Sequence, residues 1–276
     1  MNRNVVMRGG LPLGMKSTPV KIVPSLDVRH GRLTKGMNFA GAIDLGDPAE
    51  YAARYQADGA DELAFFDVAA GPEGRSLDLE TLRRVVGAVE IPVAAGGGLR
   101  SVADVEAVLA AGAKKATLAT VAFQNPDVVK EAVARFGSES IAVALDANRN
   151  VKMHSQREVF LMGGRKATGV DAVEFAKRMA DLGVGSLLPT SIVADGTSRG
   201  FDLDLIFRIA TATGVPTTAS GGAGKLVHFL EAVREAHASA LLAASSFHFH
   251  TFTVRQVKVY LTTQGVAVLN PPKPVI

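Results

Sequence analysis

The two halves of the chain carry the same short pattern. Asp27 lies at the end of the apolar run Ser25-Leu26-Asp27-Val28, and Asp146 lies in the matching run Ala144-Leu145-Asp146-Ala147. The glycine cluster at 96–98 has a counterpart at 221–222. The copies are about 120 residues apart, which is too long for a solenoid repeat and indicates two fused half-domains. Any fold for this chain must therefore place these two aspartates and two glycine turns in equivalent positions.

Short apolar runs alternate with longer amphipathic stretches along the whole chain. Apolar runs without alternation are typical of parallel strands that are buried on both faces. Eight strands, each followed by a helix, close into a barrel through right-handed crossovers. The predicted fold class is therefore α/β, a (β/α)8 TIM barrel built from two similar half-barrels. An open doubly wound sheet explains the alternation equally well but not the repeat. We predict strands at 21–26, 62–68, 92–95, 115–118, 141–145, 186–190, 216–219 and 240–243, and helices at 47–58, 77–86, 102–111, 127–136, 171–182, 203–211, 226–236 and 254–262.

The length and composition fit one barrel domain. The chain has 276 residues, and an α/β barrel of about 250 residues is a single unit. We predict a flexible N-terminal extension at 1–18, the barrel at 19–268 and a C-terminal tail at 269–276. The extension is broken by glycine and proline and does not read as a secretion signal, so we expect a cytoplasmic protein.

The charge and residue types exclude several classes of function. The formal net charge is only +3, which favours neither nucleic acid nor an anionic membrane as a partner. No apolar run approaches about 18 residues, so we expect no membrane span. There is no cysteine, and the six histidines do not form a recognisable ligand set with carboxylates. We therefore predict no metal site and no cofactor.

Four aspartates, Asp27, Asp67, Asp146 and Asp195, fall at or just past the ends of predicted strands. In a barrel, the carboxyl ends of the strands face the reaction site. A single loop aspartate more often caps backbone amides, but Asp27 and Asp146 occupy equivalent places and would face each other. Two carboxylates on opposite sides of a substrate suit general acid and base catalysis. We predict that Asp27 and Asp146 are catalytic, and the sequence leaves open which one is the acid.

The glycine turns predict an anion site in each half. Each turn follows a strand and precedes a helix, so backbone N–H groups can approach an anion without interference from a Cβ. A second turn completes each pair, with Thr120 after Ala119 in the first half and Ser245 after Ala244 in the second. We predict a ligand with a phosphate at each end, bound by Gly97, Gly98, Thr120, Ser220, Gly221, Gly222, Ala244 and Ser245.

Several segments resemble the cyclase subunit of imidazole glycerol phosphate synthase, an enzyme of histidine biosynthesis. The matching segments are 21–28, 35–39, 46–48, 60–63, 195–197, 219–225 and 243–245, and the resemblance runs from about 20 to 268. It implies a lyase that combines ammonia with a bisphosphorylated ribulosyl aminoimidazole carboxamide nucleotide, giving imidazole glycerol phosphate and aminoimidazole carboxamide ribotide. It also implies that Asp27 and Asp146 are the acid/base pair and that Lys35 lies on a mobile first loop over the substrate. Asp195, Gly196 and Thr197 match a further substrate-binding motif.

The resemblance also implies a partner. A separate glutaminase subunit would dock on the amino-terminal rim and supply ammonia through the barrel core. The family closes this entry with a ring of charges, matched here by Lys21, Glu62 and Lys115. Ser186 and Lys114 stand where the family has acids, so we expect weakened docking, because meeting like charges at an interface is unfavourable.

Other departures concern the substrate. Ala119 stands where the family has a phosphate-side asparagine, and Val193-Ala194 replace two charged residues before Asp195. Losing a polar contact to a phosphate costs on the order of 1 to 3 kcal/mol, which weakens binding more than chemistry. Two alternatives to the cyclase remain. One is an altered or paralogous barrel that binds phosphorylated ligands with lost or changed activity, and the other is the related histidine-pathway sugar isomerase, which shares the duplicated barrel and the paired aspartates.

Overall fold

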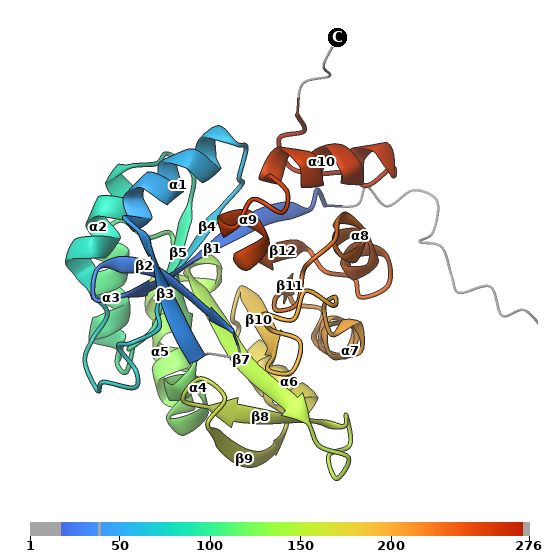
Figure 1. Ribbon diagram of the computed structural model, residues 1–276. Helices are drawn as coiled ribbons and strands as arrows, with labels where there is room; N and C mark the ends of the chain where they lie inside the picture. Colours follow the sequence, from blue (N-terminus) through green and yellow to red (C-terminus); the bar gives the residue numbers. More distant parts are fainter. Residues whose placement is uncertain (1–17, 38–39, 273–276) are drawn as a thin grey trace, which may run out of the picture.

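Eight parallel strands close into a barrel (Figure 1). The structure is a computed structural model that describes residues 18–37 and 40–272, so most of the predicted extension and the end of the predicted tail lie outside the described residues. Neighbouring strands pair in parallel, including the last with the first, and bridges from Leu187 to Thr217 and from Thr190 to Ser220 close the ring. The predicted fold class is confirmed. The barrel strands are β1 (Lys21–Arg29), β4 (Leu63–Asp67), β5 (Val93–Gly96), β6 (Lys115–Leu118), β7 (Ile141–Arg149), β10 (Ser186–Ser191), β11 (Thr218–Ala219) and β12 (Ala240–Ala243).

Long helices surround the strands and lie close to their predicted ranges. Most begin at an acidic or hydroxyl side chain that accepts a hydrogen bond from a first-turn N–H, as Asp47, Asp171 and Thr253 do. Such N-caps satisfy backbone donors that have no partner within the helix. Within the described residues, no helix is long and apolar enough to cross a membrane. These helices are α1 (Pro48–Ala57), α2 (Leu79–Gly87), α3 (Val102–Ala110), α5 (Pro126–Phe136), α6 (Ala172–Asp181), α7 (Leu203–Thr213), α8 (Leu226–Arg234) and α10 (Val254–Thr263).

Two antiparallel hairpins extend the barrel, and the sequence patterns did not predict them. The first, β2 (Arg32–Met37) and β3 (Ala40–Gly46), pairs with the end of β1. The second, β8 (Arg157–Leu161) and β9 (Lys166–Asp171), pairs with the end of β7. Both therefore follow the strands that carry Asp27 and Asp146. The duplication read from the sequence extends to these excursions, which also explains why β1 and β7 are longer than predicted.

Two short helices are likewise equivalent. The helix α4 (Thr120–Gln124) follows β6, and α9 (Ser245–His248) follows β12. Each begins right after an alanine with an unusual backbone, with φ −130° and ψ −96° at Ala119 and φ −122° and ψ −76° at Ala244. Helices this short leave no hydrophobic periodicity in the sequence. A 3-10 turn, η1 (Ser138–Ser140), precedes β7.

Alternation along the strands separates two apolar clusters. Ile22 and Leu26 of β1 face the helices and belong to the main core. Val23, between them, faces inward and packs in a second cluster with Ala64, Leu188, Ala240 and Leu242. This inner cluster fills the middle of the barrel, so polar groups are confined to its two ends.

The amino-terminal rim carries two sets of ion pairs. Glu62 accepts hydrogen bonds from Lys21 Nζ at 3.1 Å and from Lys115 Nζ at 2.9 Å. Lys258 Nζ donates to Asp61 Oδ1 at 2.6 Å, and both side chains are almost fully buried. Lys258 also donates to the carbonyls of Leu269 and Asn270. The start of the segment that we predicted as a tail is therefore held against the barrel.

Candidate active site

A cavity of about 650 Å³ opens at the carboxyl ends of the barrel strands. Most of the predicted site residues line it, although they come from both halves of the chain. Thr197 does not line it, because its hydroxyl donates to the Ala194 carbonyl at 2.7 Å and stabilises the loop instead. The predicted residues brought together in this cavity are Asp27, Lys35, Gly97, Gly98, Thr120, Asp146, Asp195, Gly196, Ser220, Gly221, Gly222, Ala244 and Ser245.

Asp27 is held as a carboxylate by its neighbours. Lys35 Nζ donates to Asp27 Oδ2 at 2.7 Å, and the Ser25 hydroxyl donates to Oδ1 at 3.1 Å. Lys35 reaches Asp27 from β2 of the first hairpin, and its side chain is only 10% exposed. Burial by itself raises the pKa of Asp27, but the charge and hydrogen bond of Lys35 outweigh it, so the pKa lies below its usual value. Asp27 is thus ionised at neutral pH.

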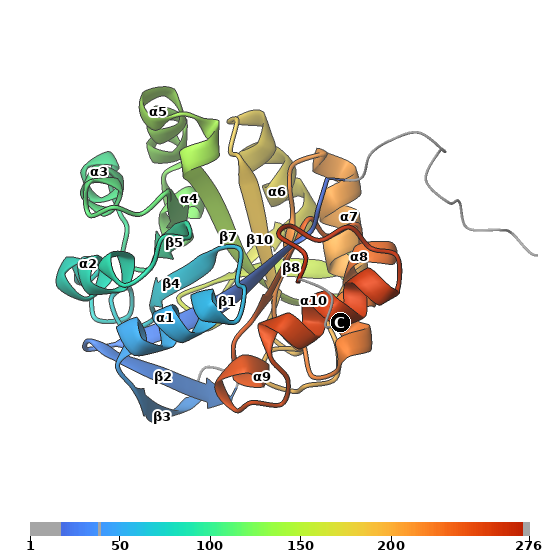
Figure 2. The same cartoon turned by 90° about the horizontal axis from the view of Figure 1, so that it is seen from above.

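A buried histidine lies close to this ion pair. Figure 2 shows α9, which ends at His248, at the same end of the barrel as the β2–β3 hairpin. His248 Nδ1 hydrogen-bonds to the Tyr55 hydroxyl, and Nε2 is buried without a hydrogen-bond partner among the described residues. Burial lowers the pKa of His248 to about 4, which the nearby charge of Asp27 opposes and that of Lys35 reinforces. His248 is therefore neutral at physiological pH.

Asp146 has the opposite environment. Its side chain has no hydrogen-bond partner in the described part of the chain, in contrast to Asp27. Burial raises the pKa of Asp146 to about 7, and the neighbouring carboxyl of Asp195 adds to the shift. Asp195 is itself raised in pKa by burial, although the charge of Lys35 opposes this. A carboxyl poised near neutrality can both donate and accept a proton at working pH.

The aromatic residues near the two aspartates also differ between the halves. The fourth residues of α4 and α6, Phe123 and Phe175, stack at 5.7 Å between ring centroids beside Asp146. The fourth residues of α9 and α1, His248 and Tyr51, form the equivalent pair at 5.8 Å in the other half. One half thus surrounds its aspartate with polar rings and a lysine, and the other with phenylalanines. The two halves therefore share their geometry but differ in side chains. Asp27 is ionised, whereas Asp146 has a pKa of about 7.

The two glycine turns are built alike. Gly97 and Gly98 have φ of +99° and +72°, and Gly221 and Gly222 have φ of +82° and +105°. Side chains other than glycine rarely adopt these values. A Cβ on Gly97 would lie 2.2 Å from the Asp67 carbonyl oxygen, and one on Gly222 would lie 2.1 Å from the Gly200 carbonyl oxygen. Both turns therefore need glycine for conformation and for space, and both leave bare backbone at the cavity.

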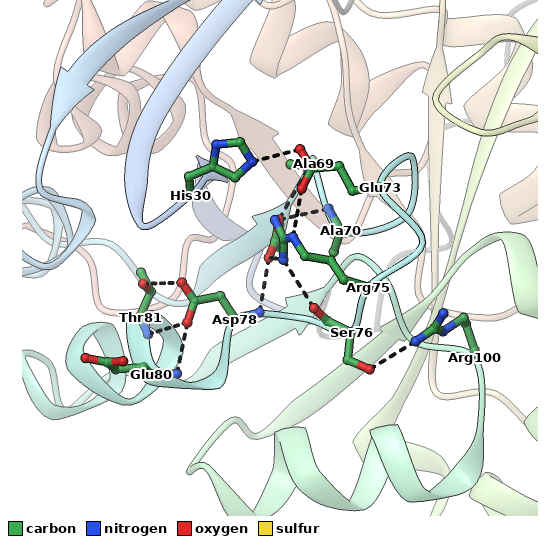
Figure 3. A network of polar contacts seen from close by, with 11 residues as sticks. His30, Ala69, Ala70, Glu73, Arg75, Ser76, Asp78, Glu80, Thr81 and Arg100 are labelled. Atoms are coloured by element: carbon green, nitrogen blue, oxygen red, sulfur yellow. Dashed lines mark hydrogen bonds and ion pairs between the residues drawn. The ribbon is translucent and has the colours of Figure 1, made fainter.

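Asp67, at the end of β4, has a structural role. Its side chain is 1% exposed and accepts hydrogen bonds from both terminal nitrogens of Arg75, at 2.6 and 2.9 Å. It also accepts backbone N–H groups from Ala69 and Ala70. Figure 3 shows how Glu73 extends this network from Arg75 to His30. Asp67 thus anchors the loop below the first glycine turn, the capping role open to any loop aspartate.

The sequence reasoning missed the arginines around the cavity. Arg29, Arg75, Arg100 and Arg165 all line it. Arg100 donates to the Gly74 carbonyl at 2.7 Å and to the Ser76 hydroxyl at 3.2 Å, and Figure 3 shows the contact with Ser76. Side chains two residues apart on a strand point to the same face, so Arg29 could have been predicted from its spacing to Asp27. No local pattern indicates Arg165. Arginine guanidinium groups suit an anionic ligand.

The two departures that we expected to weaken substrate binding, at Ala119 and at Val193-Ala194, lie in different places. Ala119 lines the cavity, so the missing asparagine side chain bears on the site directly. Val193 and Ala194 do not line it, and Val193 is 59% exposed. No group of three or more histidine, cysteine or carboxylate side chains that could hold a metal ion occurs within the described residues.

The fold and the cavity define a (β/α)8 barrel with two carboxyls, whose pKa values are shifted in opposite directions, between two glycine turns. Comparison with known protein families matches residues 21–253 to the family described as histidine biosynthesis protein. The chain belongs to this family, which covers both the cyclase and the isomerase barrels of the histidine pathway. It is therefore a barrel of the histidine-pathway enzyme type.

Proposed function

We propose that the protein is the cyclase of imidazole glycerol phosphate synthase. In this reaction, ammonia and the bisphosphorylated ribulosyl aminoimidazole carboxamide nucleotide give imidazole glycerol phosphate and aminoimidazole carboxamide ribotide. The observation that carries the proposal is the pair Asp27 and Asp146 on one cavity, with pKa values shifted in opposite directions. Ring closure with loss of a fragment needs a base and an acid at the same time. We place the reaction in the cytoplasm.

The environments of the two aspartates support a separate role for each. Asp27, ionised beside Lys35, is the general base, and Asp146, with a pKa of about 7, is the general acid. The glycine turns at 97–98 and 221–222 hold the two phosphates through backbone N–H groups. Arg100 and Thr120 supplement the first of these phosphate sites. Lys35 releases Asp27 to the substrate when the first hairpin closes over the bound ligand.

Lys35 is what favours the cyclase over the sugar isomerase. The stretches 35–39, 228–232 and 247–249 resemble the cyclase, and Lys35 contacts the proposed base directly. The alternative of a barrel with lost or changed activity is favoured by Ala119, which leaves one phosphate site without a side-chain amide. These alternatives differ in the substrate that is turned over.

The test supplies each substrate in turn. With saturating ammonium, the bisphosphorylated ketose should be converted to imidazole glycerol phosphate, and Asp27→Asn or Asp146→Asn should lower the rate by a factor of about 10² or more. Asp204→Asn, a carboxylate on the exposed face of α7, serves as the matched control. Turnover of only the isomeric aminoaldose would establish the isomerase instead. Phosphate-ligand binding without turnover of either compound would establish the altered barrel.

We also propose that a glutaminase docks on the amino-terminal rim, where Lys21, Glu62 and Lys115 form the charged cluster. Lys114 adds an exposed positive charge beside it, and Ser186 brings none. We expect glutamine to replace ammonium poorly, and Lys114→Glu to improve glutamine-dependent turnover with a glutaminase of the family. An unchanged ratio of glutamine-dependent to ammonium-dependent rates in Lys114→Glu would contradict this docking surface.

A further inference from the structure

The helices that follow the two glycine turns begin in the same way, on opposite sides of the barrel (Figure 1). α3 follows the turn at 97–98, and α8 follows the turn at 221–222. The third residue of each helix, Asp104 in α3 and His228 in α8, stands seven positions after the first glycine of its turn. Asp104 and His228 are therefore equivalent residues of the two halves.

Asp104 holds the backbone that leaves the first turn. Its Oδ2 accepts the N–H groups of Arg100 at 2.9 Å and of Ser101 at 3.0 Å. Burial raises the pKa of Asp104, but hydrogen bonds from these N–H groups and from serine hydroxyls outweigh it, so the pKa lies below its usual value. The acceptor at the first turn is therefore a carboxylate at neutral and mildly acidic pH.

His228 makes the same two contacts at the second turn. Its Nδ1 accepts the N–H groups of Gly224 at 3.2 Å and of Lys225 at 3.3 Å. A backbone N–H group can only donate, so Nδ1 carries no proton and the ring is neutral, with its hydrogen on Nε2. The duplicated contact is thus made by a carboxylate in one half and by an imidazole in the other.

The backbone that His228 supports is continuous with the second turn. Gly222 and Ala223 line the cavity, and Gly224 follows them directly. The Gly200 N–H donates to the Gly222 carbonyl at 2.8 Å. A Cβ on Gly200 would lie 3.6 Å from the imidazole ring, so Gly200 packs against His228 as well. His228 therefore supports the turn both along the chain and through Gly200.

We propose that His228 is the positioning residue of the second phosphate turn and that its protonation weakens phosphate binding at that turn alone. A proton on Nδ1 removes the acceptor of both backbone bonds and places one N–H group against two others. The first turn keeps its acceptor, because Asp104 stays ionised. The inference rests on the proposed function in taking the second turn as a phosphate site.

The surroundings of His228 place its protonation in acid. Burial lowers the pKa of His228, the charge of Glu231 on α8 opposes this shift, and that of Lys225 adds to it, so the pKa lies below its usual value. Among the described residues, Glu231 and Lys225 are the charged groups that act on the ring. The ring is therefore neutral at pH 7, and the second turn is fully supported there.

A titration with sodium sulfate at a series of pH values tests this role. Sulfate keeps its two charges, whereas a phosphate ester, with a second pKa of about 6, gains a proton as pH falls. NMR of isotope-labelled protein follows the amide signals of Gly98 and Gly222, which give one dissociation constant for each turn, and the ring signals of His228. As pH falls through the midpoint of the ring signals, the dissociation constant at Gly222 should rise about five- to tenfold relative to that at Gly98. A ratio that stays constant or falls would overturn the proposal, as would a ring that stays neutral until the protein unfolds.

Variants at neutral pH separate positioning from packing. His228→Phe keeps a ring but offers no acceptor, so the dissociation constant at Gly222 should rise about five- to tenfold while that at Gly98 keeps its wild-type value. His228→Asn offers an amide oxygen near the position of Nδ1 and does not titrate, so it should restore binding at Gly222 and abolish the pH dependence. Asp104→Leu is the matched change in the other half and should weaken binding only at Gly98. Equal dissociation constants at Gly222 in His228→Phe and wild type would overturn the proposal.

Failure of the proposed function gives a different result. If sulfate moves neither glycine signal, the turns bind no anion, and the proposed phosphate sites are refuted together with the role of His228. If sulfate binds at both turns with a ratio that neither pH nor His228→Phe changes, only the role of His228 is lost. The pH series uses the wild-type protein, so misfolding of His228→Phe does not leave the question open.

Discussion

The Lys35 ammonium and the Asp27 carboxylate form a part-buried ion pair at 2.7 Å, made by a hairpin that crosses back over the strand it follows. The pair keeps Asp27 ionised although burial opposes this. Among residues 18–37 and 40–272, no lysine or arginine pairs with Asp146 in this way. The hairpin therefore determines which of two duplicated aspartates is the base.

Replacing Lys35 should shift the pH dependence of turnover. In Lys35→Met, the main opposition to burial is lost and the Ser25 hydrogen bond and His248 remain, so the pKa of Asp27 rises and the base is protonated at a higher pH. The acidic limb of kcat/KM should move upward in pH, with turnover at pH 7 lowered about 10- to 100-fold. Lys35→Arg keeps the positive charge, so its acidic limb of kcat/KM should lie close to that of the wild type. An acidic limb in Lys35→Met that coincides with wild type would show that Asp27 does not act as the base.

Asp146→Asn should stabilise the protein at alkaline pH. The pKa of Asp146 is raised in the folded state, so its ionised form favours the unfolded chain, and stability is lost as pH rises from about 4 through about 7. Relative to wild type, Asp146→Asn should gain about 2 to 4 kcal/mol at pH 8 and almost nothing near pH 3.5. Urea unfolding at both pH values measures this.

Asp27→Asn is the matched comparison, with the opposite sign. The pKa of Asp27 is lower in the folded state than in the unfolded chain. Its ionised form therefore stabilises the fold above the pKa of the unfolded chain, and this stability is lost as pH falls through the pKa of the folded state. Asp27→Asn should therefore lose stability at pH 8. If both variants changed stability in the same direction at pH 8, the inferred asymmetry of the two carboxyls would be wrong.

The glycine turns should tolerate no side chain. Gly97→Ala and Gly222→Ala each combine a positive φ with a Cβ that meets a backbone carbonyl at 2.2 or 2.1 Å. Each should cost roughly 3 kcal/mol or more in the free energy of unfolding. Gly214→Ala is the control, because its φ is +65° but no atom lies within 4 Å of the added methyl. That variant should cost only about 1 kcal/mol, and equal losses in all three would refute the steric argument.

The sequence predicted the repeating frame of this barrel because buried parallel strands and amphipathic helices leave strong periodic signals. It missed all four strands of the two hairpins, among them β2 (Arg32–Met37) and β9 (Lys166–Asp171), which are rich in polar residues. Such strands are specified by pairing with a neighbour and not by their own pattern. The short helices α4 and α9 were not predicted because a single helical turn is too short to show hydrophobic periodicity.

The site was predictable as far as it follows the repeat. Asp27, Asp146 and both glycine turns were found by comparing one half with the other, and the structure brings them to one cavity. The roles of the aspartates were not, because they depend on Lys35, which an unpredicted hairpin brings to Asp27, and on the burial of Asp146. Burial and partner charge, which set a pKa, arise only from tertiary packing.

Removing one partner of the buried pair of Lys258 and Asp61 should cost more stability than breaking an exposed ion pair. Their side chains are 2% and 0% exposed, and Lys258 also holds the carbonyls of Leu269 and Asn270. Lys258→Met leaves Asp61 buried without its cation and should cost roughly 3 to 5 kcal/mol in urea unfolding. The double variant Lys258→Met/Asp61→Asn should recover part of this, because the amide oxygen still accepts the Ile22 N–H, which is 2.8 Å from Asp61. Arg208→Ala, which breaks the exposed pair with Asp204, should cost less than about 1 kcal/mol. Equal effects of Lys258→Met and Arg208→Ala would mean that burial does not strengthen the Lys258 pair.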